Sequence, residues 1–106
     1  MNTSKTDLEI AREFAGLLRA RTQAVREIIL FGSVARGEAT EESDIDVALV
    51  VTSKDAAVRE IQLEAGEQIM NKHGALIGCV TYSLAEWEKA RRFPFGAQVS
   101  KQGLKL

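Results

Sequence analysis

Apolar and polar residues alternate along the chain in blocks that predict helices and strands in turn. Leu8, Ala11, Phe14 and Leu18 recur at the three- and four-residue spacing of an amphipathic helix. Later apolar runs are short and rich in strand-forming residues, which is typical of buried strands. The pattern predicts a helix over residues 6–21, strands over 25–31, 44–51 and 76–82, a short helix over 33–36, and helices over 54–72, 83–92 and 94–102.

Local signals predict where several of these helices begin. Thr6 with Glu9, and Ser83 with Glu86, have the spacing of capping boxes. Ser53 is expected to cap the helix over 54–72.

The order of the elements predicts an α+β fold. The connection between residues 31 and 44 is too long for a tight hairpin and lacks a full crossover helix. We therefore expect a small mixed β-sheet with helices packed on one face, in a single domain over residues 1–106.

The composition of the chain bears on its partners, its disulfides and its location. The 106 residues carry a net charge of −1, which gives no electrostatic reason to expect nucleic acid or an anionic membrane as a partner. The single cysteine, Cys79, excludes an internal disulfide and is expected to be a small buried residue. The first residues lack the long apolar region of a signal peptide, so a cytoplasmic location is expected.

Two carboxylates stand two residues apart at the start of a predicted strand. Asp44 and Asp46 precede an apolar run over 47–51, and side chains at this spacing point to the same face of a strand. Adjacent carboxylates repel each other and resist burial, which a bound cation relieves. Mg²⁺ prefers oxygen ligands and keeps water and substrate phosphates among them. We expect Asp44 and Asp46 to bind Mg²⁺; the alternative is an exposed pair at a strand entry.

A turn suited to phosphate follows the strand over 25–31. Gly32 would allow the backbone to approach a phosphate because it has no Cβ. Ser33 would offer a hydroxyl and backbone N–H groups to the β- or γ-phosphate. These residues predict a nucleotide site beside the carboxylates.

Two further residues of this segment are candidates for nucleotide binding. Arg36 could contact phosphate, and pairing with Glu38 or Glu41 is an equally good interpretation. Gly37 belongs to the same segment, although a role in the turn is the simpler reading of it.

The string GSVARGEATEESDID places Gly32-Ser33 ten residues before Ser43-Asp44-x-Asp46. This spacing resembles the minimal nucleotidyltransferases of the DNA polymerase beta superfamily, most strongly over residues 28–51. A weaker similarity lies in Phe93-Pro94-Phe95 followed by Gly103. The resemblance implies the nucleotidyltransferase fold, ATP or another nucleoside triphosphate as substrate, Mg²⁺ as cofactor, and Asp44 and Asp46 as catalytic residues.

The same resemblance implies a partner. Minimal nucleotidyltransferases are frequently paired with a small helical HEPN protein in toxin–antitoxin modules, and the nucleotidyl chain can act as antitoxin by transferring AMP to a partner hydroxyl. Aminoglycosides are a rival class of acceptor, disfavoured because the chain has no room for a second binding domain.

One departure from the family pattern affects the expected activity. Active members commonly carry a third carboxylate on a later strand, and the strand over 76–82 contains no Asp or Glu. Three explanations are open: slow catalysis on two carboxylates, an acid supplied by another chain or by a homo-oligomer, and a degenerate module that binds nucleotide or partner without turnover.

Other polar and aromatic residues have structural interpretations. His73 is expected to be a solvated residue at a helix end. Core packing is a more common use of Tyr82 and Trp87 than base stacking. The lysines that could reach phosphate are Lys54, Lys72 and Lys101.

Overall fold

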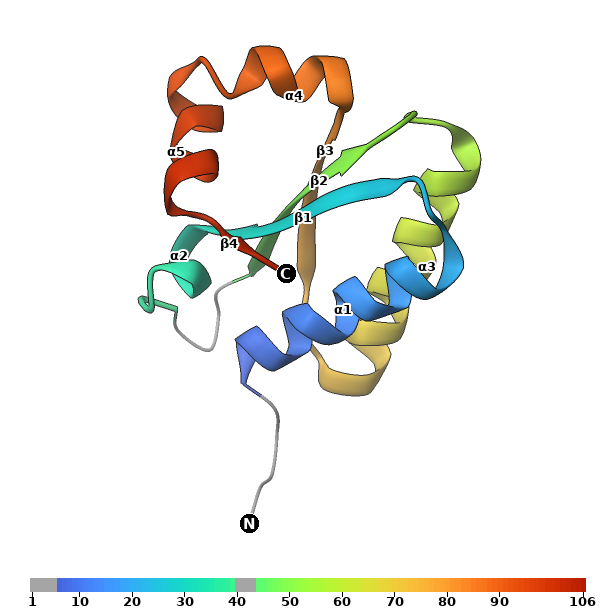
Figure 1. Cartoon of the computed structure of the whole chain (residues 1–106). Coiled ribbons are helices and arrows are strands. Elements are labelled where there is room, and N and C mark those ends of the chain that lie inside the picture. Colours follow the sequence, from blue (N-terminus) through green and yellow to red (C-terminus); the bar gives the residue numbers. More distant parts are fainter. Residues whose placement is uncertain (1–5, 40–43) are drawn as a thin grey trace.

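The computed structural model describes residues 6–39 and 44–106, which form four strands and five helices (Figure 1). Within these residues no helix is both long and apolar enough to cross a membrane. In chain order the elements are α1 (Asp7–Arg21), β1 (Val25–Phe31), α2 (Gly32–Ala35), β2 (Ile45–Val51), α3 (Ala56–His73), β3 (Ile77–Ser83), α4 (Leu84–Ala90), α5 (Pro94–Gln102) and β4 (Leu104–Lys105).

The strands form one mixed sheet in the order β3-β2-β1-β4. β1 runs antiparallel to both β2 and β4, whereas β2 and β3 are parallel. The parallel pair is possible because α3 carries the chain back across the sheet between them. β4 was not predicted, since two exposed residues give no alternating pattern to detect.

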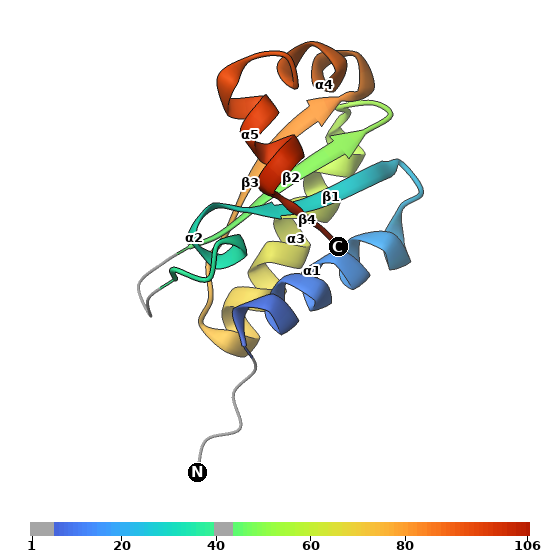
Figure 2. The same cartoon turned by 60° about the vertical axis from the view of Figure 1, so that its left-hand side comes forward.

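The two longest helices, α1 and α3, lie side by side on one face of the sheet (Figure 1, Figure 2). Phe14 and Leu18 of α1 and Ile69 of α3 are almost fully buried against Val47 and Leu49 of β2. Burying an apolar side chain of this size contributes about 1.5–3 kcal/mol. This layer is therefore the main source of stability in the fold.

A smaller apolar cluster occupies the other face. Ile29, Ala48 and Val50 alternate with the residues of the main core and pack against Trp87 of α4 and Val99 of α5. The predicted α+β fold with a small mixed sheet is confirmed, and α1 and α3 pack on one face as expected. The partial cover of the opposite face by α4 and α5 is an addition to that prediction (Figure 2).

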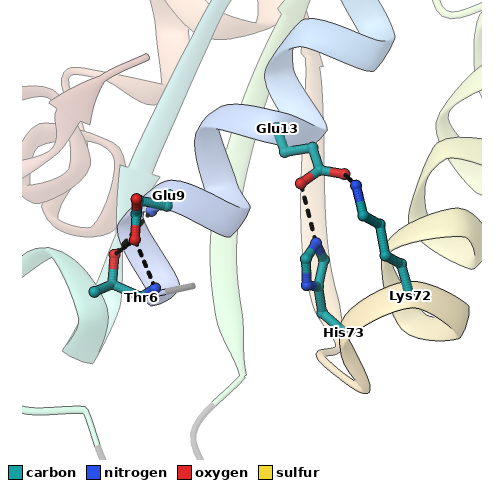
Figure 3. Close-up of polar contacts among 5 residues, drawn as sticks. All are labelled: Thr6, Glu9, Glu13, Lys72 and His73. Atoms are coloured by element: carbon teal, nitrogen blue, oxygen red, sulfur yellow. Dashed lines mark hydrogen bonds and ion pairs between the residues drawn. The ribbon is translucent and has the colours of Figure 1, made fainter. Parts of the chain in front are cut away.

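Both predicted capping boxes are present. The Thr6 hydroxyl accepts a hydrogen bond from the Glu9 amide at 3.2 Å, and the Glu9 carboxylate accepts one from the Thr6 amide at 2.9 Å (Figure 3). Ser83 and Glu86 exchange the same two bonds at the start of α4. These boxes satisfy amides that have no partner within their helices.

The structure corrects several predicted boundaries. Ser53 does not cap α3: the carboxylate of Asp55 accepts a hydrogen bond from the Val58 amide at 2.9 Å, and the helix begins at Ala56. Ser and Asp are comparable caps, so propensity could not choose between them. β2 begins at Ile45 rather than at Asp44, and β3 covers residues 77–83 rather than 76–82.

A polar contact between α1 and α3 involves His73 (Figure 3). Glu13 pairs with Nζ of Lys72 at 2.9 Å and with Nε2 of His73 at 3.0 Å. The His73 side chain is only 12% exposed, so the prediction of a solvated residue is wrong. His73 and Lys72 are used in joining the two helices, on the face of the sheet that carries the main core.

Candidate active site

Three residues of neighbouring strands lie in one row across the sheet. In the strand register Asp46 of β2 is opposite Phe31 of β1 on one side and Gly78 of β3 on the other. Ile45 and Val47 point into the main core, so Asp46 between them points to the opposite face, where α4 and α5 pack. The row lies where β1 ends and where β2 and β3 begin.

The carboxylate of Asp46 lies against the backbone of two glycines. A Cβ at Gly32 would stand 2.4 Å from Oδ2 of Asp46, and a Cβ at Gly78 would stand 3.4 Å from Oδ1. We call this group of Gly32, Asp46 and Gly78 the Asp46 seat. Gly32 also has a φ of +77°, a conformation that residues with a Cβ rarely adopt. Sequence reasoning predicted that Gly32 leaves space for phosphate; in the structure it leaves space for a carboxylate.

The electrostatics of the seat disfavour the ionised form of Asp46. Burial raises the pKa of this carboxyl, and the charge of Asp44 raises it further. The nearby Arg36 acts in the opposite direction and lowers it. Asp44 is exposed and stands just before β2 begins. The two carboxylates therefore interact, as their spacing predicted, and a cation beside them would relieve the repulsion.

The segment after β1 brings Arg36 near the seat. α2 is a single turn, and a second left-handed glycine, Gly37 at φ +73°, ends it. The Glu38 amide then donates to the Ser33 carbonyl at 2.8 Å. Nε of Arg36 pairs with Glu38 at 3.0 Å, and the charge of this guanidinium also acts on Asp46. Gly37 has the turn conformation that its simpler reading predicted.

Two residues weighed in the sequence lie outside the described ranges. They are Ser43, expected before Asp44, and Glu41, the second possible partner of Arg36.

The third carboxylate of the family pattern is absent from β3. The residue of β3 opposite Asp46 is Gly78, and β3 carries no acid. Glu86 does not fill the gap, because it caps α4 and pairs with Nζ of Lys54 at 3.2 Å. Within residues 6–39 and 44–106 no group of three His, Cys, Asp or Glu side chains could hold a metal. A Mg²⁺ ion held here by Asp44 and Asp46 would take water and substrate oxygens at its other positions, because their carboxylates are oxygen ligands of the kind that this ion prefers.

The aromatic and sulfur side chains of β3 and α4 have structural environments. The rings of Tyr82 and Trp87 lie 5.2 Å apart, and Trp87 is 4% exposed, as core packing predicts. Cys79 is half-buried on the side of the main core, where burial raises the pKa of its thiol to about 12. Such a thiol is a poor nucleophile near neutral pH.

Sequence reasoning did not identify a hollow beside the seat. Phe31, Gly32 and Arg36 form one wall, and Phe95, Gln98 and Gln102 of α5 form the other. The signal for it was weak: an aromatic residue and two amides at helical spacing near the chain end.

Comparison with known proteins shows the family of this chain. Residues 11–99 match the model of the nucleotidyltransferase domain. The chain belongs to the nucleotidyltransferase family. A Methanocaldococcus jannaschii protein, MJ0604, provisionally named a protein adenylyltransferase, is 32% identical over 93 residues, which are 87% of this chain and 89% of MJ0604.

Two solved structures share the fold. One, described as a minimal nucleotidyltransferase, has a TM-score of 0.65 and 18% identity, with 99% of this chain and all of that chain covered. The other is an MNT antitoxin in complex with a tri-AMPylated HEPN toxin of Shewanella oneidensis. Its TM-score is 0.56 at 20% identity, with 94% of this chain and 71% of that chain covered. The expected family, fold and enzyme class are therefore confirmed: the protein is a nucleotidyltransferase.

The structure predicts that Gly32 cannot carry a side chain while Asp46 keeps its place. Gly32→Ala and Gly37→Ala both force alanine into a left-handed conformation, at a cost of about 1–2 kcal/mol each. Only Gly32→Ala also drives a Cβ into a carboxylate, because no atom of residues 6–39 or 44–106 lies within 4 Å of a Cβ at Gly37. We expect Gly32→Ala to lower the free energy of unfolding by about 1–3 kcal/mol more than Gly37→Ala, measured by urea denaturation.

The double variant Gly32→Ala with Asp46→Ala is the control, since removing the carboxylate should remove the additional cost. Equal costs for the two glycines would contradict the structure of the seat.

A second prediction concerns pH. A raised pKa means that ionised Asp46 destabilises the folded chain, and this cost disappears as the pH falls below the ordinary value of 3.8. Asp46→Asn should therefore increase the free energy of unfolding at neutral pH without Mg²⁺, by about 0.5 kcal/mol or less because solvent screens the charges. The gain over the unmodified protein should vanish near about pH 3.

Glu60→Gln, on the exposed side of α3, makes the same change of charge away from the seat and should not raise the free energy of unfolding at neutral pH as Asp46→Asn does. A loss of stability in Asp46→Asn at neutral pH would contradict the prediction.

Proposed function

We propose that this nucleotidyltransferase transfers AMP from ATP, with Mg²⁺, to a hydroxyl group on a helical HEPN-type partner. The observation that carries the proposal is the Asp46 seat, which holds one carboxylate near the charge of Asp44 and adjoins, through Gly32, a hollow between α2 and α5. Two relatives support this acceptor class. MJ0604 is provisionally named a protein adenylyltransferase, and the MNT antitoxin was solved with an AMPylated HEPN toxin.

We assign Asp44 and Asp46 to the binding of Mg²⁺ and to catalysis. Their oxygens are the hard ligands that this ion prefers. Bound Mg²⁺ would neutralise charge on the triphosphate and on the leaving pyrophosphate. The raised pKa of Asp46 supports this role, because a bound cation would offset the burial and the repulsion by Asp44 that raise it.

The segment after β1 is assigned to the phosphates. Ser33 offers its hydroxyl, and Gly32 and Gly37 shape the turn that presents it. Arg36 offers a guanidinium whose charge already acts on Asp46. Its exposed pair with Glu38 is weak enough to open for phosphate, because ion pairs of this kind contribute about 1 kcal/mol or less.

The chemical step is a displacement at the α-phosphorus of ATP. The acceptor oxygen, from a Tyr, Ser or Thr hydroxyl, forms the new bond to phosphorus as the bond to the pyrophosphate oxygen breaks. The hydroxyl proton passes to solvent or to a carboxylate of the site, and pyrophosphate leaves. The residues of this chain orient the α-phosphate and hold the negative charges in place.

Gly78 favours a second candidate function. With glycine opposite Asp46, the family's third carboxylate has no counterpart on β3, and β3 offers no group that would activate the acceptor. A module that binds nucleotide or partner and neutralises a toxin by occlusion alone would need no such group.

Transfer of labelled AMP separates the two functions. We expect the unmodified chain, incubated with Mg²⁺, α-labelled ATP and a HEPN-type protein from the same genome, to release pyrophosphate and label a hydroxyl of that protein. Asp44→Asn with Asp46→Asn should reduce the initial rate by roughly 100-fold or more, because charge stabilisation at the reacting phosphate is lost.

Glu60→Gln is the control for a loss of negative charge elsewhere, and it should label the partner at the normal rate. Equal transfer by the double variant would contradict the assigned carboxylates. Toxin neutralisation without any transfer would establish the second function, and no binding of nucleotide at all would contradict the assignment of a nucleotide site.

A further inference from the structure

The hollow between α2 and α5 adjoins the Asp46 seat. Gly32 belongs to both: it lies against the Asp46 carboxylate and lines the hollow together with Phe95 and Gln98. A ligand whose phosphates lie at the seat can therefore extend past Gly32 into the hollow. We propose that the hollow binds the base of the nucleotide and selects adenine, an inference that rests on the proposed function.

An exposed aromatic ring forms one side of the hollow. Phe95 of α5 is 50% exposed and meets Phe31 of β1 edge to face, with ring centroids 5.5 Å apart and an interplanar angle of 85°. Phe31 in turn is the register neighbour of Asp46. At this exposure the contact with Phe31 leaves much of Phe95 uncovered, and an exposed aromatic ring is a platform on which any base can stack.

Two amides on α5 supply the means to distinguish bases. Gln98 and Gln102 are one helical turn apart, and Nε2 of Gln98 donates to Oε1 of Gln102 at 3.3 Å. A glutamine amide carries a donor and an acceptor side by side, which matches N7 and N6–H₂ of adenine. Guanine presents two acceptors at the same edge, N7 and O6, so it satisfies only the donor. The hollow thus favours adenine over guanine.

A second hollow on the same face provides a matched control. Phe93 lies two residues before Phe95, is 59% exposed, and lines that separate hollow together with Tyr82 and Lys89. Phe93→Ala removes an exposed aromatic ring of the same kind from the same segment. It does not alter the hollow that contains Gly32 and Arg36.

The test is equilibrium binding of ATP, GTP and inorganic triphosphate, each with Mg²⁺, to the whole chain by calorimetry. Phe95→Ala should weaken ATP binding roughly 10-fold or more, the size expected for loss of one stacked base. Its affinity for inorganic triphosphate, which has no base, should stay unchanged. Gln98→Ala should reduce the preference for ATP over GTP roughly 10-fold. Phe93→Ala should bind all three ligands normally.

Phe95→Leu is the control for a loss of fold, because leucine keeps an apolar contact with Phe31 but offers no aromatic ring. This variant should weaken ATP binding as much as Phe95→Ala does. Normal ATP affinity in both Phe95 variants, or a selective loss in Phe93→Ala, would overturn the base site while the proposed function stands. The same holds if the unmodified chain binds triphosphate as tightly as ATP. Failure of the unmodified chain to bind either ligand would overturn the proposed function together with this inference.

Discussion

The carboxylate of Asp46 lies against the turn that follows β1, and it can do so only because Gly32 has no Cβ; Gly78 of β3 lies on its other side. This contact fixes what surrounds it. Gly32 takes a left-handed conformation that turns the chain directly from β1 into α2, and that turn carries Arg36 toward the carboxylate. The same contact disfavours the ionised form of Asp46. Its carboxylate is partly buried and lies near the charge of Asp44, and without a cation it is poorly stabilised.

One face of the sheet carries the main apolar core, and the other carries the candidate active site. α1 and α3 bury the main apolar core on one face and join through Glu13, Lys72 and His73, so the single histidine serves the scaffold. The other face carries Asp46 and is covered only in part, by α4 and α5. A site can form there because a short β4 holds the end of the chain against β1, and so keeps α5 close to α2.

Much of this could be predicted from the sequence. Continuous apolar runs and capping boxes located the strands and most helices, and the spacing of Gly32, Asp44 and Asp46 indicated the family that the comparisons confirm. The sequence did not reveal which residues of neighbouring strands lie opposite each other. That Gly78 is the residue opposite Asp46 depends on the register of β2 and β3, which no local pattern specifies. The role of Phe95 depends on how α5 packs, and that is decided by tertiary contacts.

The most direct test of the account is to locate the metal on the chain. Mn²⁺ can replace Mg²⁺, and its unpaired electrons broaden the NMR signals of nearby amides. With ATP present, we expect a small amount of Mn²⁺ to broaden the amides of Gly32, Asp46 and Gly78 most strongly, and those of Val25 and Val51, at the other ends of β1 and β2, least. Asp46→Asn should abolish the effect. Broadening centred on any other part of the chain, or equal broadening in the variant, would contradict the assignment of the Asp46 seat as the metal–nucleotide site.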